Sequence, residues 1–118
     1  MSNQIVTPAM IEARLKDLSK QVDDTHKELA DAEKLYFETK AKYEISLAQA
    51  RLSLSGKATK ITVGDKADMA LVATADLHMQ MATAEAIVRA ARGNAQRVRT
   101  QVDIARSIGT SVRTSMEL

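Results

Sequence analysis

Apolar and small residues recur at alternating steps of four and three from Ala70 to Met116. This spacing keeps one stripe of side chains on one side of an α-helix, and its seven-residue period is typical of a coiled coil. We call such a stripe the seam. The uninterrupted repeat predicts one helix from about residue 66 to 114. Its seam consists of Ala70, Thr74, Leu77, Met81, Ala84, Val88, Ala91, Ala95, Val98, Val102, Ala105, Gly109, Val112 and Met116.

The N-terminal half carries a second seam of the same kind, which begins at Ile11. Thr7 is placed to cap this helix, and Pro8 suits its first helical position because proline lacks an N–H and has a helical φ. Gly56 follows the last seam residue, so a helix is expected from about residue 8 to 54. Its seam contains Ile11, Leu15, Leu18, Val22, Thr25, Leu29, Ala32, Tyr36, Thr39, Tyr43, Leu47, Ala50 and Leu54.

Residues from about 55 to 65 form the expected linker between the two helices. Gly56 and Gly64 interrupt helical periodicity, and the β-branched residues between them suit a short extended piece. Asp65 is the expected N-cap of the second helix. Gly93 lies inside that helix, where a kink is possible but not required.

The composition favours helices that need further partners. The 118 residues include one Pro, four Gly and only three aromatic residues, so the chain is predicted to be a single all-helical domain over residues 1–118. Small residues dominate the second seam, so each contact there buries little area. Assembly as a homo-oligomer would cover the apolar residues that lie off the seams. These are Leu35, Ile45, Leu52, Leu71, Val72, Met79, Ile87, Ile104 and Ile108.

Several classes of protein lack support in the sequence. There is no cysteine, and His26 and His78 have no second ligand at helical spacing, so neither a metal site nor a cofactor is expected. No nucleophile has a base placed beside it by sequence, and we expect no enzymatic activity. The chain shows neither a secretion signal nor an apolar run of about 20 residues, which predicts a cytoplasmic protein without a membrane partner.

Positive charge gathers on the second helix. From Ala86 to Met116 there are six arginines and a single acidic residue, Asp103. Four of the arginines recur every seven residues, each one position after a seam residue, and this spacing suggests a row that faces away from the first helix. We call them the arginine row: Arg92, Arg99, Arg106 and Arg113. Arg89 and Arg97 occupy adjoining outward positions.

Two interpretations of the arginine row remain open at this point. Arginines on a long helix commonly keep it soluble or pair with acidic residues of a neighbouring helix. Alternatively, the consistent use of Arg, where the first helix uses mostly Lys, favours bidentate contacts to phosphate. Several such contacts across an oligomer would add up as avidity.

The order of features resembles a known family. A long helix that ends in "AQARLSLSGKA" is followed by a lysine-bearing linker and by a long helix that begins near "DKADMALVATAD". In this order the chain resembles the UvsY-like recombination mediators of tailed phages, over roughly Leu35 to Met116. The family has basic residues on both sides of the alanine that corresponds to Ala50. Arg51 matches this pattern, whereas Gln49 does not.

The resemblance implies a helical oligomer that binds single-stranded DNA and assists the loading of a RecA-type recombinase. It further implies contacts with that recombinase and with single-strand-binding protein, in the cytoplasm of a bacterial host if the protein is phage-encoded. Binding would be mainly electrostatic, because only Tyr36, Phe37 and Tyr43 could stack on bases. The candidate DNA-binding residues are Arg51, Lys57, Lys60, Lys66, Arg89, Arg92, Arg97, Arg99, Arg106 and Arg113.

A second function from another class fits the same sequence. A structural or adaptor coiled coil, such as a secretion or virion component, would use the arginines to pair with an acidic protein partner. The WXG secreted hairpins are one such family, but this chain contains no tryptophan.

Overall fold

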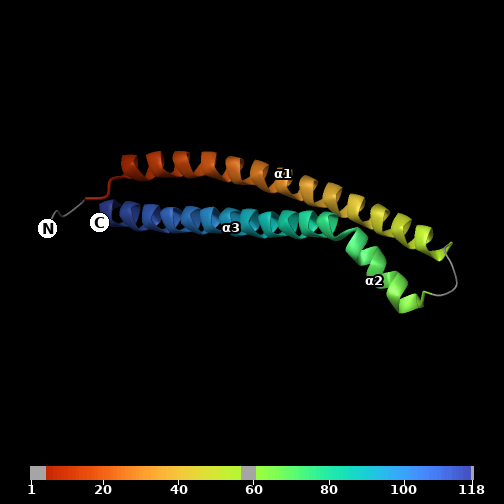
Figure 1. Cartoon of the computed structure of the whole chain (residues 1–118). Coiled ribbons are helices and arrows are strands. Elements are labelled where there is room, and N and C mark those ends of the chain that lie inside the picture. Colours follow the sequence, from red (N-terminus) through yellow and green to blue (C-terminus); the bar gives the residue numbers. More distant parts are fainter. Residues whose placement is uncertain (1–4, 57–60, 118) are drawn as a thin grey trace. The chain divides into compact units, whose positions relative to one another are not determined.

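The computed structural model describes residues 5–56 and 61–117, and these residues form three α-helices. Helix α1 is Pro8–Ser55, α2 is Val63–Ala73 and α3 is Ala75–Glu117 (Figure 1). Within the described ranges there is no β-strand. The all-helical class and the pair of long helices, α1 and α3, are confirmed, but the second predicted helix is not continuous, because it is divided into α2 and α3.

Helix α1 begins as its sequence predicts. The Oγ1 atom of Thr7 accepts a hydrogen bond from the N–H of Met10 at 3.3 Å, and the Thr7 carbonyl accepts one from Ile11 at 3.2 Å. The cap satisfies N–H groups that have no partner within the first turn. Pro8 is the first residue of the helix.

The start of α2 corrects the sequence prediction. Thr62, with extended backbone angles, is the N-cap, and its Oγ1 accepts a hydrogen bond from the N–H of Asp65 at 3.1 Å. Asp65 therefore lies inside the first turn, where its negative charge favours the positive end of the helix. The linker ends at Thr62 rather than near residue 65, and Val63, expected in the extended piece, is already helical.

Thr74 separates α2 from α3. Its hydroxyl donates to the carbonyl of Ala70 at 2.9 Å and to that of Leu71 at 3.3 Å, and its own carbonyl accepts from His78 at 3.0 Å. A threonine hydroxyl that bonds back to the preceding turn competes with the helix ladder and bends helices. The interruption thus occurs at a buried seam position, whereas the helix continues without a break through Gly93.

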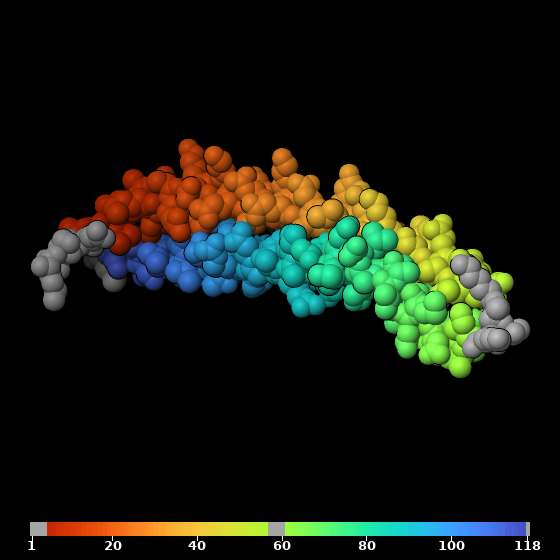
Figure 2. All heavy atoms as spheres, viewed as in Figure 1, coloured from red at the N-terminus to blue at the C-terminus, as the bar shows by residue number. Residues whose placement is uncertain are grey.

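The helices pack in two compact units. The first comprises Met1–Ala30 and Ala90–Leu118, and the second comprises Asp31–Arg89. In the first unit the start of α1 lies beside the end of α3, as the space-filled view shows (Figure 2). In the second unit the rings of Tyr43 and His78 meet at 5.1 Å between centroids. Within each unit, the segments of α1 and α3 run antiparallel to one another.

Burial follows the predicted seams. Every buried residue in the described part of the chain lies on one of the two seams that the sequence predicts. In the first unit the buried seam residues are Ile11, Leu18, Thr25, Ala95, Val98, Ala105 and Gly109, and in the second they are Ala32, Ala70, Thr74, Ala84 and Val88. Because five of these residues are alanines, the core is thin.

The apolar residues off the seams are exposed. Leu35, Ile45 and Leu52 on the first helix are all exposed, so the chain's own helices do not cover them, and their cover by a homo-oligomer stays a prediction. The same holds for Ile87, Ile104 and the other off-seam positions of the second half. The physical reason is that the other helices of the chain cover the seam side of α1 only.

Candidate nucleic-acid interface

Six arginines of α3 carry the proposed interface, and all six are exposed. Five of them belong to the first unit, and Arg89 belongs to the second. A step of seven residues on an α-helix is two turns, or about 10.5 Å. The row therefore presents guanidinium groups at a regular interval along one side of α3.

The position of two members of the row, Arg106 and Arg113, relative to α1 differs from the sequence prediction. Arg106 and Arg113 line a shallow groove of about 140 Å³ together with Glu12 and other residues of α1. They lie beside the seam and do not face away from the first helix. A residue one position after a seam residue is rotated by only about 100° around the helix axis. Its side chain therefore lies at the flank of the contact between α1 and α3. We call this hollow the arginine groove.

Gly109 brings the helices close together at the arginine groove. A β carbon on Gly109 would lie 3.2 Å from the Cγ2 atom of Ile11, so the two helices approach closely at this point. Arg113 donates from Nε to the Gly109 carbonyl at 3.4 Å, which holds its guanidinium group close to α3. Arg106, Glu12 and Arg113 thus border one hollow, which holds one carboxylate and two cations.

The arginines differ in the partners they already have. Arg89 forms an ion pair with Glu85 at 2.6 Å, and the hydrogen bond and charge of that carboxylate raise the pKa of Arg89. Arg97 donates to the side-chain oxygen of Asn94 at 2.6 Å. Arg92 also takes part in an interaction within the chain. With the residues that the structure describes, Arg99 and Arg106 make neither a hydrogen bond nor an ion pair.

Four of the candidate DNA-binding residues form a basic cluster near the linker: Arg51, Lys57, Lys60 and Lys66. The structure describes only two of them. Arg51 is exposed on the last turns of α1, and Lys66 is half-buried in α2. Both belong to the second unit. Lys57 and Lys60 lie outside the described residues, so their share in the cluster stays a prediction.

The three aromatic residues occupy the second unit. Phe37 is exposed and its ring lies 5.5 Å from that of Tyr36, which also has the Lys40 ammonium 6.0 Å above it. An exposed aromatic ring suits stacking on a base. Tyr43 instead packs against His78 between the helices. Phe37 is therefore the best-placed stacking residue of the three.

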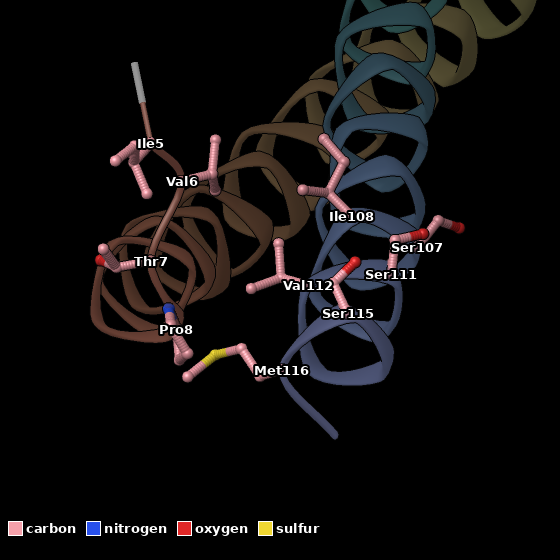
Figure 3. Close-up of a pocket in the computed structure, with 10 residues that line it drawn as sticks. All are labelled: Ile5, Val6, Thr7, Pro8, Ser107, Ile108, Ser111, Val112, Ser115 and Met116. Carbon is pink, nitrogen blue, oxygen red and sulfur yellow. The ribbon is translucent and has the colours of Figure 1, made fainter. Parts of the chain in front are cut away.

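Two apolar grooves were not foreseen from the sequence. In the first unit, residues 5–8 and the last turns of α3 enclose a groove of about 700 Å³, which we call the serine groove (Figure 3). In the second unit, Leu35, Met79 and Ile87 border a smaller one of about 350 Å³. The signal for both was the off-seam apolar residues. The α3 side of the serine groove consists of Ser107, Ile108, Ser111, Val112, Ser115 and Met116.

Other kinds of site are absent from the described part of the chain. No three His, Cys, Asp or Glu residues there lie close enough together to hold a metal ion. None of the described helices is long and apolar enough to span a membrane. Comparison with protein-family models, curated proteins and solved structures found no match to this chain.

Proposed function

We propose that this chain is a recombination mediator that binds single-stranded DNA through its phosphates and assists loading of a RecA-type recombinase. The observation that carries the proposal is the pair Arg99 and Arg106. Both are exposed, they lie one heptad apart, and they make no hydrogen bond or ion pair with the described residues. Guanidinium groups of this kind are suited to bidentate contacts with phosphate oxygens.

Charge along α3 supports the same function. From Ala90 to Met116 the helix contains five arginines and only one acidic residue, Asp103. A phosphate chain that follows this side of α3 meets cations at regular intervals and little repulsion. Glu12 in the arginine groove opposes anion binding at one end of the row, so contacts there should be weaker than at Arg99.

The proposal includes partners that follow from the family resemblance. The chain would contact the recombinase and single-strand-binding protein, act as a homo-oligomer and work in the cytoplasm of a bacterial host. Repetition of the row in several copies would raise the affinity for a long strand, since linked weak sites bind with avidity.

A structural or adaptor coiled coil is the second candidate, and the arginine groove favours it. Because Arg106 and Arg113 flank the seam beside Glu12, they could serve helix pairing itself and extend that pairing to an acidic partner protein. In this case the row has no nucleic-acid ligand.

A titration of labelled single-stranded oligonucleotide, followed by fluorescence anisotropy at two salt concentrations, separates the two functions. An unlabelled duplex of equal length serves as competitor. The mediator function requires binding that weakens with salt and that the duplex displaces poorly. Absence of binding at the lower salt concentration would favour the adaptor.

A further inference from the structure

The serine groove offers an uncharged surface at the end of the first unit. None of the side chains that line it is ionisable, although 27% of the chain's residues are charged. Figure 3 shows Val6, Ile108 and Val112 around the hollow, with Met116 at its edge. Three serines, Ser107, Ser111 and Ser115, follow one another at steps of four on the same helix. Their small side chains leave room for another helix to approach.

The groove lies on the side of the seam opposite to the arginine row. Residues 106 and 113 border one hollow, and residues 108, 111 and 115 border the other. At 100° per residue, Arg106 and Ile108 are separated by about 200° around α3. A partner that occupies the serine groove therefore leaves the arginines accessible.

A single copy of the chain leaves much apolar surface without cover. The described residues include sixteen large hydrophobic side chains that are exposed, against nine buried apolar residues, five of them alanine. A thin core of this kind is commonly completed by association. The partner that fills the groove should therefore be apolar, helical and always available. A second copy of this chain meets all three conditions.

The groove and the apolar residue next to it offer a surface for such a contact. Ile5, Val6, Ile108 and Met116 of the groove, and Ile104 one turn before Ile108 on the same side of α3, are between 43% and 80% exposed. A stable interface covers ~800 Å² per partner, and these side chains together with the exposed serines supply a large part of it. The patch also holds both projecting side chains, such as Ile5, and a hollow, as a twofold contact needs.

We propose that two copies of this chain pair through the serine groove, with the exposed apolar side chains of each copy seated in the groove of the other. The pairing gives the predicted homo-oligomer a defined surface. It leaves the arginine rows of both copies open, and it does not depend on nucleic acid. If the chain does not bind DNA, the proposed pairing through the serine groove is unaffected.

The test is the mass of the full chain in solution, measured by light scattering after size exclusion without DNA. The natural chain should elute with at least twice its 12.9 kDa, and Ile108→Glu should reduce the mass to that of one copy. Ile87→Glu is the matched control, because Ile87 is an isoleucine of α3 with 46% exposure against 44% for Ile108, yet lies in the second unit. It should keep the natural mass. Circular dichroism checks that both variants remain helical.

Crosslinking supplies a second readout that does not rely on disruption. The chain has no cysteine, so Ser111→Cys should form a disulfide or a short-linker crosslink between copies. Thr110→Cys is its neighbour outside the groove and should not. A natural chain that stays monomeric at high concentration, an Ile108→Glu variant that still associates, or equal crosslinking at both cysteines would overturn the pairing.

Discussion

Gly109 packs directly against Ile11, since a β carbon on the glycine would stand 3.2 Å from the isoleucine Cγ2 atom. This contact joins the first turn of α1 to the last turns of α3 and holds the arginine groove together. A glycine inside a helix costs about 1 kcal/mol relative to alanine. At this position the cost is offset by the close approach of the two helices.

The two mid-helix glycines of α3 should respond differently to substitution. Gly93→Ala should raise the free energy of unfolding by about 1 kcal/mol, because nothing lies within 4 Å of its added methyl group. Gly109→Ala should gain less, and Gly109→Leu should lose stability by about 1–3 kcal/mol through overpacking against Ile11. Urea unfolding at one protein concentration measures all three. Equal gains at both glycines would contradict the observed contact.

Leu18 is the largest fully buried side chain in the described residues, with 0% exposure. Leu18→Ala should lower the free energy of unfolding by about 2–4 kcal/mol, since it removes buried methyl groups and leaves a cavity. Leu52→Ala is the control, because Leu52 lies in the same helix with 72% exposure and should change stability by less than about 0.5 kcal/mol. Thermal unfolding of the two variants side by side measures this difference in stability. A large loss of stability in the Leu52 variant would show that another copy of the chain covers Leu52.

Substitutions of Thr62 and Asp65 test which of the two residues caps α2. Thr62→Ala should destabilise the helix by about 1 kcal/mol, because the N–H of Asp65 loses its acceptor. Asp65→Ala should cost less, about 0.3–0.5 kcal/mol, through the helix dipole alone. Hydrogen exchange of the first amides of α2 reports the effect locally. The reverse order of effects would restore the cap that the sequence suggested.

The arginine row gives the sharpest test of the proposed function. The triple substitution of Arg99, Arg106 and Arg113 by Ala should reduce the salt dependence of single-strand binding, with the slope of log K against log salt falling by about 2, or 0.7 for each lost phosphate contact. The triple substitution of Lys16, Lys20 and Lys27 by Ala removes equal charge from α1 of the same unit. It should leave the slope nearly unchanged, and an equal decrease in both variants would mean that general charge, not the row, binds the strand.

The candidate site was predicted only in part. The exposure of all six arginines followed from their positions off the seam. The place of Arg106 and Arg113 beside Glu12 did not, because it depends on how α1 and α3 are aligned. Phe37 could have been recognised as an exposed aromatic residue from the sequence, because it lies one position off the seam, between the seam residue Tyr36 and the charged Glu38. For the serine groove the sequence showed only the apolar residues off the seam, and not their meeting, since the groove joins residues 5–8 to residues 107–116 at the other end of the chain.

The seams were determined by the sequence alone: each buried residue from Ile11 to Gly109 stood on a stripe that the 3-4 repeat had already defined, because helical periodicity is a local property of the chain. Only the tertiary structure decided three further matters. Thr74 interrupts the second helix although Thr25, Thr39 and Thr83 make similar backbone contacts without a break. The apolar residues off the seams remain uncovered by the chain's own helices, and Arg106 and Arg113 flank the contact with α1. These outcomes depend on which side of each helix another segment covers, and no local pattern of residues specifies that.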